Sequence, residues 1–136
     1  MIIEAIPPRI RPSITAAPRA GQLYWCRFWD AEHTEQPEFY KTRPVIILSH
    51  RNTLSGHCLV IPASSKQQYG KWSILLSLSL DGSKSWAVCD HIYTVATSRL
   101  QKHEGTIPKL SELEFARILE LAHQQFAMPR KTEGSL

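Results

Sequence analysis

The stretch Lys41-Thr42-Arg43-Pro44-Val45-Ile46-Ile47-Leu48-Ser49 indicates the fold class of this 136-residue chain. Its β-branched run follows a proline and ends at polar residues, which is typical of a buried strand. Four more segments combine apolar, β-branched or aromatic residues with turn residues at their ends: 22–29, 57–62, 73–80 and 86–95. Residues 99–100 are a candidate for a further short strand. The sequence therefore predicts a mainly β protein.

Only the C-terminal part of the chain has a helical pattern. Ser111 and Glu114 have the spacing of a capping box, and Pro129 ends the pattern. Between them, apolar side chains recur at helical intervals: Phe115, Ile118, Leu119, Ala122 and Phe126. We expect an amphipathic helix over about 112–128 that packs its apolar stripe on the sheet. Five or so short strands followed by one helix predict a small β-barrel or half-barrel with a helical lid.

The chain is expected to form one domain with an extension at each end. Four of the nine prolines lie in the first 18 residues and follow no helical or strand period, which predicts an extended arm over 1–20. The domain is then expected over 21–129, with a flexible tail at 130–136. The longest aliphatic run, 45–48, is too short to cross a bilayer, and the N-terminus lacks the basic start of a signal peptide. We expect a cytoplasmic protein with no membrane partner.

Charge is distributed unevenly along the chain. The net charge is +4, yet residues 39–109 hold nine bases and three acids, whereas residues 30–38 hold four acids and no lysine or arginine. A polyanion would therefore meet a basic body beside an acidic loop. The absence of a Gly-rich phosphate loop excludes a P-loop nucleotide hydrolase. The three cysteines form neither a disulfide framework nor a C-x-x-C zinc pattern.

Four polar residues are candidates for chemistry, and each also has a structural explanation. Arg43 opens a strand and is either a solvated base or a phosphate ligand. Ser64 follows a strand and is either a turn former or a hydroxyl donor. Asp90 lies in an apolar strand pattern, where an acid needs a partner, so an ion pair and a functional role are equally compatible with it. His33 lies in the acidic loop, where simple exposure to solvent also explains it.

A metal site and a thiol nucleophile are two further interpretations. Cys89 and His91 are two apart on a predicted strand and would share a face. No second ligand pair supports them, because His57 and Cys58 would point to opposite faces of their strand. All three cysteines lie in apolar strand patterns, which favours buried and inert thiols. We expect no metal site.

Taken in order, several segments resemble the MazF/PemK (Kid) family of toxins from bacterial toxin–antitoxin pairs over about residues 21–127. Residues 41–49 have an Arg-Pro pair before an aliphatic strand, residues 60–65 end in a small hydroxyl cluster, and residues 88–95 contain an Asp-x-Ile-x-Thr-Val segment. Two further matching segments are 21–25, which precedes these three, and Arg99-Leu100, which follows them. The resemblance implies an SH3-like barrel of the MazF/PemK/CcdB type that forms a homodimer. It further implies an endoribonuclease that needs no metal or cofactor, cuts single-stranded RNA to 2′,3′-cyclic phosphate and 5′-hydroxyl ends, and binds a small acidic antitoxin.

The resemblance also implies roles for the candidate residues. Arg43 would stabilise the phosphorane, and Ser64 stands where the family usually has threonine. Asp90 matches an acid proposed as the base in the PemK branch, and His33 matches a histidine in that branch's first loop. Neighbouring residues are expected to contact RNA: Ser65, Lys66, Lys41 and Lys71.

One position departs from the family pattern. Val88 stands where PemK-type toxins have a catalytic arginine, two residues before the aspartate. A non-catalytic SH3-like binding module, such as an inactive toxin relic or a relative of the gyrase poisons, is therefore the alternative function.

Overall fold

Short antiparallel strands and one long helix make up the regular secondary structure. The computed structural model describes residues 4–66 and 70–129, so the predicted tail at 130–136 lies outside the described residues. The elements are β1 (Leu23–Arg27), η1 (Ala31–His33), β2 (Thr42–Ile47), β3 (His57–Ser64), β4 (Ser73–Leu75), β5 (Trp86–Val88), β6 (Tyr93–Ala96), η2 (Thr97–Arg99), β7 (Leu100–Gln101) and α1 (Glu112–His123).

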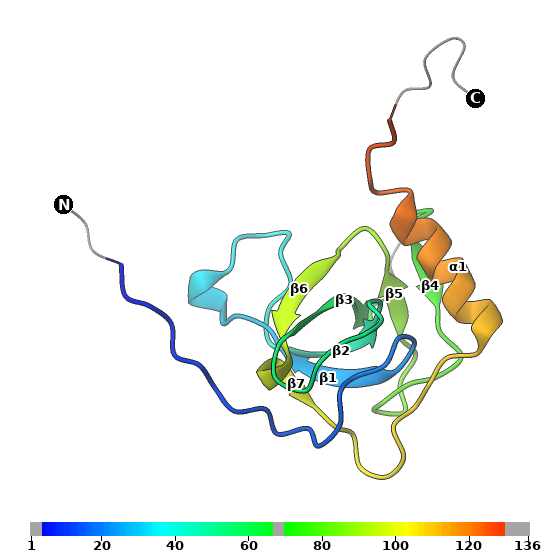
Figure 1. The fold of residues 1–136 in the computed structure, drawn as a ribbon. Coiled ribbons are helices and arrows are strands. Elements are labelled where there is room, and N and C mark those ends of the chain that lie inside the picture. The colour runs from blue at the N-terminus through cyan, green and yellow to red at the C-terminus, as the bar shows by residue number, and fades with distance from the viewer. Residues whose placement is uncertain (1–3, 67–69, 130–136) are drawn as a thin grey trace.

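The sheet is organised around β3, its longest strand. The strand order is β4-β5-β3-β2-β1-β7, and β6 pairs with the first half of β3. All these pairings are antiparallel, and β3 contacts β6 near Cys58 and β5 near Ser64. The sheet therefore curls around β3 into an open barrel, with α1 on its outside (Figure 1). This confirms the prediction of a mainly β fold with a C-terminal helix.

The continuous apolar run of β2 reflects burial on both faces. Ile46 packs with Ile61 of β3 and Ile118 of α1 in one hydrophobic cluster, whereas Val45 and Ile47 belong to a second cluster on the other face. All three β2 residues have no exposed surface. A strand with one solvated face alternates apolar and polar residues, and a strand buried on both faces has no such constraint. The stretch that indicated the fold class thus forms the wall between the two clusters.

Helix α1 begins where the capping box predicts. The Ser111 hydroxyl accepts a hydrogen bond from the Glu114 N–H at 3.2 Å, which satisfies one of the unpaired amides of the first turn. Ile118 and Ala122 are buried, so the predicted stripe does face the sheet.

The predicted C-terminal end of this helix is wrong. The helix ends at His123 and not near residue 128, and Phe126 is 57% exposed outside the stripe. After the last α-helical turn the hydrogen bonds join residues three apart: Gln125 N–H bonds to the Ala122 carbonyl at 3.0 Å and Phe126 N–H to the His123 carbonyl at 3.2 Å. Such 3-10-type hydrogen bonds are common at the C-terminus of an α-helix.

The predicted strand over 73–80 is correct only for its first three residues, which form β4. Beyond β4, Ser77 donates both its backbone N–H and its hydroxyl to the Glu114 carboxylate, at 3.1 and 2.9 Å. The helix therefore takes the hydrogen bonds that a neighbouring strand would have made. Leu76 and Leu80 are still buried, although they lie outside any strand. The alternation of serine and leucine therefore reflects which side chains are buried and not strand structure.

The single strand predicted over 86–95 is in fact two strands joined by a turn. His91 N–H bonds to the Val88 carbonyl at 3.1 Å, and residues 89–92 leave the strand conformation before β6 continues along β3 in the same direction as β5. Asp90 therefore lies in an exposed turn and not inside an apolar strand, which corrects our expectation for its environment. The short strand predicted at 99–100 is β7, one residue later in the chain.

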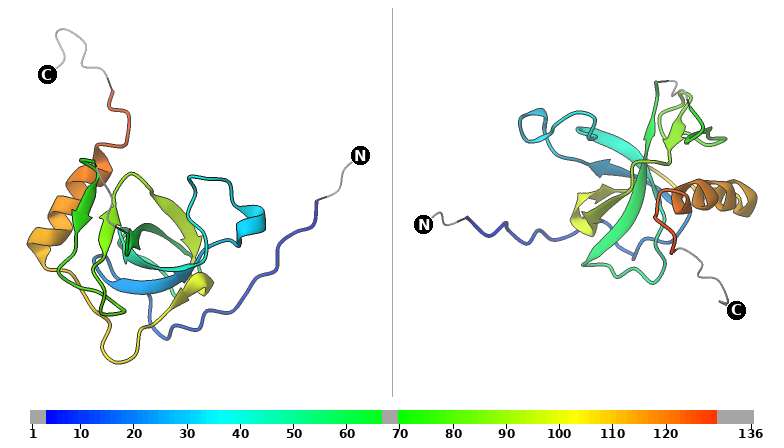
Figure 2. Two further views of the ribbon diagram at one scale, coloured as in Figure 1. Left: turned by 180° about the vertical axis from the view of Figure 1, so that it is seen from behind. Right: turned by 90° about the horizontal axis from the view of Figure 1, so that it is seen from above.

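The N-terminal arm runs outside the barrel, on the side opposite α1 in every view (Figure 2). Its described residues, 4–20, contain no helix or strand. Ile14 is buried in the second cluster and Ser13 donates its hydroxyl to the Leu100 carbonyl at 3.2 Å, so the second half of the arm is anchored. Gly21, at φ +87°, turns the arm into β1, a conformation that L side chains rarely adopt.

No helix in the described part of the chain combines the length and apolar character that a membrane span needs.

Candidate functional site

Arg43 is held in a defined orientation at the start of β2. Its Nε–H donates to the Tyr40 carbonyl at 2.9 Å, and its guanidinium carbon lies 5.0 Å from the centre of the Phe39 ring. The side chain is half-buried, and no carboxylate pairs with it among residues 4–66 and 70–129. A guanidinium fixed through Nε can present its outer N–H groups to an anion.

Ser64 is the last residue of β3, the strand that neighbours β2. The pairing of these strands ends at Val45 opposite Pro62, and Arg43 and Ser64 each lie two residues beyond that pair. Ser64 is 4% exposed, and its hydroxyl oxygen accepts from the Lys66 N–H at 3.2 Å. Neighbouring strands thus carry two candidates that are distant in the sequence.

Asp90 and His91 form a second group, in the turn between β5 and β6. The His91 Nδ1 lies 2.9 Å from Asp90 Oδ1, and His91 Nε2 lies 3.3 Å from the Pro37 carbonyl oxygen. Both partners are acceptors, so both contacts are hydrogen bonds only when both ring nitrogens carry protons. The side chain of Asp90 is 37% exposed and that of His91 23% exposed, which leaves the carboxylate accessible.

Phe39 connects these two groups through its ring. One contact is with the Arg43 guanidinium, and the other is with His91, whose ring centre lies 5.0 Å away in an edge-to-face arrangement of 70°. Tyr93 holds the backbone at the same point, because its hydroxyl oxygen accepts from the Phe39 N–H at 2.9 Å. The loop between β1 and β2 is therefore fastened to β6 beside the site (Figure 1).

His33 lies apart from this arrangement. Its Nδ1 is 2.6 Å from Asp30 Oδ1 within η1, and its side chain is 71% exposed. This hydrogen bond is the main cause that lowers the pKa of Asp30 below its ordinary value. Among the described residues, no hydrogen bond or ion pair joins His33 to Arg43, Ser64 or Asp90.

The four residues expected to contact RNA are exposed near the site. Ser65 and Lys66 follow the end of β3, and Lys71 lies with its Nζ 4.7 Å from the centre of the Trp72 ring. Lys41 adopts a left-handed conformation with φ 69°, which is uncommon for a residue with a side chain. Its N–H donates to the Trp29 carbonyl at 3.1 Å, so the strained backbone is part of the loop's attachment to β1.

The cysteines have no environment for nucleophilic chemistry. All three are buried, and burial raises the pKa of Cys26 and of Cys89 to about 12 and that of Cys58 to about 11. No cluster of three or more metal-binding side chains occurs within the described ranges. Val88 is 5% exposed on β5, so the position that departs from the family pattern faces the protein interior.

The sequence analysis missed the functional setting of His91 and Phe39. The sequence suggested a metal ligand as the only role for His91 and assigned no role to Phe39. A histidine directly after the candidate acid, together with aromatic residues in the first loop, was the available signal. The contact between residues 37–39 and 91–93 depends on the turn at residues 89–92, which interrupts the strand predicted over 86–95.

Comparisons with known proteins agree with this architecture. The sequence model of PemK-like, MazF-like toxins of type II toxin–antitoxin systems matches residues 19–126. Similar solved structures include MazF from Deinococcus radiodurans, with a TM-score of 0.65 and 19% identity over 81% of this chain and 96% of that one. A MazE–MazF structure from the same organism has a TM-score of 0.61 and 17% identity, with 85% and 100% covered.

An endoribonuclease in complex with its cognate antitoxin, from a mycobacterial species, has a TM-score of 0.59 and 18% identity over 85% of this chain and 100% of that one. None of the curated proteins matches the chain.

Proposed function

Because the chain belongs to the family of PemK-like, MazF-like toxins of type II toxin–antitoxin systems, we propose that it cuts single-stranded RNA without a metal or cofactor. The products would be a 2′,3′-cyclic phosphate and a 5′-hydroxyl end. The observation that carries the proposal is Arg43, fixed by the Tyr40 carbonyl and the Phe39 ring at the start of β2, the strand next to the one that ends in Ser64.

This reaction needs groups that the candidate site can supply. Attack of a ribose 2′-hydroxyl on the neighbouring phosphate requires a base for that proton, an acid for the leaving 5′-oxygen, and positive charge at the developing phosphorane. Arg43 stays charged at ordinary pH and can give two parallel hydrogen bonds to phosphate oxygens, so its role is to stabilise the phosphorane. The Ser64 hydroxyl rotates to donate one more hydrogen bond when the phosphate binds.

Asp90 and His91 are suited to the proton transfers. Asp90 is an accessible carboxylate and takes the 2′-hydroxyl proton, while His91, hydrogen-bonded through both nitrogens, returns a proton to the leaving oxygen. His33 is kept as a second candidate for proton transfer, because η1 belongs to the same loop as Phe39. Ser65, Lys66, Lys41 and Lys71 contact the RNA backbone.

A cleavage assay with matched variants tests this assignment. Pure protein is incubated with a long single-stranded RNA in EDTA, and the product ends are identified chemically. We expect discrete fragments that end in cyclic phosphate, and a loss of about 10²–10³ in rate for Arg43→Ala, by analogy with other preorganised donors. Lys84→Ala, which removes an exposed base far along the chain, serves as the control.

The proposal has clear conditions for failure. Near-wild-type cleavage by Arg43→Ala at saturating RNA would show that the site is misplaced. His33→Ala and His91→Ala, compared over a range of pH, decide which histidine transfers a proton. Lys71→Ala is expected to weaken RNA binding in a salt-dependent way with little effect on the rate at saturation.

The alternative is a non-catalytic SH3-like binding module, and Val88 is the observation that favours it. An apolar side chain buried at the position of a PemK-type arginine cannot take part in phosphate chemistry. RNA that stays intact at stoichiometric protein would support this alternative over the enzyme.

We further propose a homodimer with a small acidic antitoxin as its partner. The similar structures include a MazE–MazF structure and an endoribonuclease with its cognate antitoxin. The chain also leaves large apolar side chains exposed: Leu75, Leu113, Phe126 and Met128. Light scattering that returns a monomer at micromolar concentration would reject the dimer, and a neighbouring reading frame that encodes no small acidic protein would argue against the partner.

A further inference from the structure

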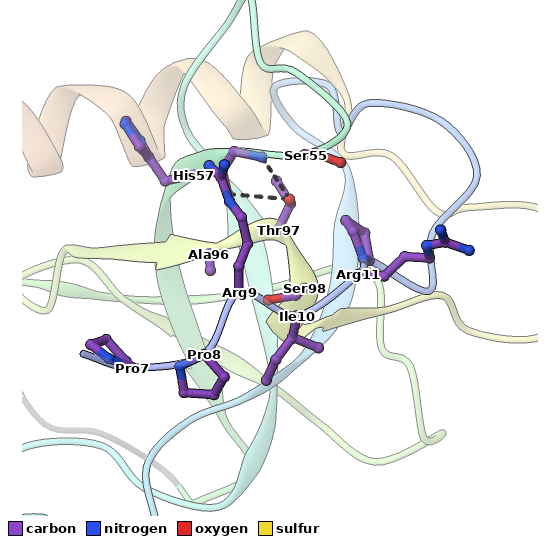
Figure 3. A pocket seen from close by; sticks show the side chains of 12 residues that line it. Pro7, Pro8, Arg9, Ile10, Arg11, Ser55, His57, Ala96, Thr97 and Ser98 are labelled. Carbon is purple, nitrogen blue, oxygen red and sulfur yellow. Dashed lines mark hydrogen bonds between the residues drawn. The ribbon is translucent and has the colours of Figure 1, made fainter. Parts of the chain in front are cut away.

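Residues 7–12 of the N-terminal arm lie outside the residues that match the family, and they form one wall of a hollow of about 640 Å³. The other wall consists of the start of β3, the end of β6 and η2. Arg9 extends from the arm across this hollow toward the segment that holds Ser55 and His57 (Figure 3). Arg11 lines the same hollow.

The charges of this hollow have a single sign. Its lining contains Arg9, Arg11 and a histidine, and it contains no aspartate or glutamate. Both arginines are exposed, and neither forms an ion pair with any residue that the structure describes. Glu4 is the one acid among the described residues of the arm. Arginines without carboxylate partners favour an anionic ligand.

A second depression borders η2 at Arg99. Ser98 lines the hollow, and the next residue, Arg99, lines the depression together with Lys41 and Trp29. The Arg99 guanidinium lies 5.0 Å from the centre of the Trp29 ring and donates to the Arg27 carbonyl at 2.8 Å. Lys41 belongs to the loop that carries Phe39 and Tyr40, and the Tyr40 carbonyl binds Arg43, so the basic residues from Arg9 to Lys41 mark a path toward Arg43.

Asp30 is the acid that borders this second depression. Its carboxylate accepts hydrogen bonds from the side chain and the backbone N–H of His33 at 2.6 and 3.1 Å, so part of its charge is compensated locally. Asp30 is thus the one acid among the described residues that line the two hollows, against three arginines and one lysine on the proposed path from Arg9 to Lys41.

We propose that single-stranded RNA follows this path, from the reaction site across η2 to the arm, where Arg9 and Arg11 bind its phosphates. This inference rests on the proposed function for the identity of the ligand. Among the described residues, the hollow is lined by hydroxyl groups, arginines and one histidine but by no phenylalanine, tyrosine or tryptophan, so it suits the RNA backbone better than the bases, and we expect its contribution to be independent of RNA sequence.

The salt dependence of RNA binding tests the path. The probe is a long RNA that is methylated on every 2′-oxygen, because such an RNA cannot supply the attacking hydroxyl and stays intact. Each phosphate contact on a single strand contributes about −0.7 to the slope of log K against log salt, so Arg9→Gln/Arg11→Gln should make the slope shallower by about 1.4. Between about 50 and 200 mM salt, the variant should therefore lose about sevenfold less affinity than the wild type.

The control variant Lys84→Gln/Arg117→Gln removes the same charge from exposed positions away from the path, and it should keep the wild-type slope. An arm variant with the wild-type slope would overturn the proposal. If the arm variant loses binding of a poly-glutamate peptide while its RNA slope is unchanged, the hollow binds an acidic peptide and the assignment to RNA is wrong.

A separate readout distinguishes this inference from the proposed function. If wild-type protein cleaves ordinary RNA but the arm variant has the wild-type slope, only the path is wrong. If wild-type protein binds RNA with the arm-dependent slope but never cleaves it, the path stands and the endoribonuclease proposal fails. A short oligonucleotide that reaches only the reaction site should be cleaved equally by the wild type and the arm variant.

Discussion

Phe39→Ala tests the central structural argument, that one ring couples the loop between β1 and β2 to both halves of the site. The substitution removes the contact with the Arg43 guanidinium at 5.0 Å and the edge-to-face contact with His91 at 5.0 Å. A cation–π contact contributes about 0.5–1 kcal/mol at exposed sites and up to about 2 kcal/mol when desolvated. An aromatic pair contributes about 0.5–1.5 kcal/mol, and both contacts here are half-buried. The loop should therefore lose about 2 kcal/mol of stabilisation against local opening.

Hydrogen exchange measures this loss without any assumption about function. About 2 kcal/mol corresponds to an open population about 30-fold larger. The amide at position 39, which donates to the Tyr93 hydroxyl oxygen, and the Lys41 amide, which donates to the Trp29 carbonyl, should exchange faster by that factor. Amides in β3 should keep their protection.

The matched control is Phe126→Ala, which removes a ring that is 57% exposed near the C-terminus. It should leave the loop amides unchanged. If exchange at positions 39 and 41 in Phe39→Ala stays within about twofold of the wild type, the ring does not hold the loop. RNA cleavage by the same variant then shows whether loop order matters for the reaction.

Three further predictions concern stability and reactivity. Ile46→Ala should lower the free energy of unfolding by about 2–5 kcal/mol in a denaturant titration, because Ile46 is fully buried between β3 and α1, and a value below about 1 kcal/mol would contradict that packing. Hydrogen bonds from Ser83 and Ser79 lower the pKa of Asp81, so its stabilising effect is present above the ordinary value of 3.8 and is lost as the pH falls through the lowered pKa; the stability difference between wild type and Asp81→Asn should shrink over that acid range, and a constant difference would refute the assignment. The thiols of Cys26 and Cys89, whose pKa burial raises to about 12, should react with iodoacetamide at pH 8 only after unfolding, and rapid labelling of the native protein would show that they are accessible.

Local sequence patterns were reliable where one residue's neighbours along the chain decide its structure. The capping box placed the start of α1 because its hydrogen bond spans three residues, from Ser111 to Glu114. Prediction from neighbouring residues failed over much of 73–80, where the alternation of serine and leucine indicated a strand. The partner of Ser77 is the carboxylate of Glu114, which no neighbouring residue could have revealed.

The candidate site was predictable in part. Arg43 and Ser64 were proposed because of the segments in which they lie, and these segments form the neighbouring strands β2 and β3. His91 was not proposed, because the turn after Val88 reads as continuous strand in the sequence. His33 lies in its predicted loop, yet its hydrogen bond is with Asp30, three residues away.

The sequence by itself determined the strands around 45–47, the start of the helix and the basic character of the middle of the chain, since composition and short-range spacing suffice for these features. Only the tertiary structure decided which polar groups meet. The Phe39 ring lies between Arg43 and His91, and the arm lies beside the start of β3, because the sheet curls around β3 and carries distant loops to one side. Contacts of this kind depend on the register and curvature of the whole sheet. Both are set by the packing of residues that are distant in the sequence, so short-range patterns do not predict them.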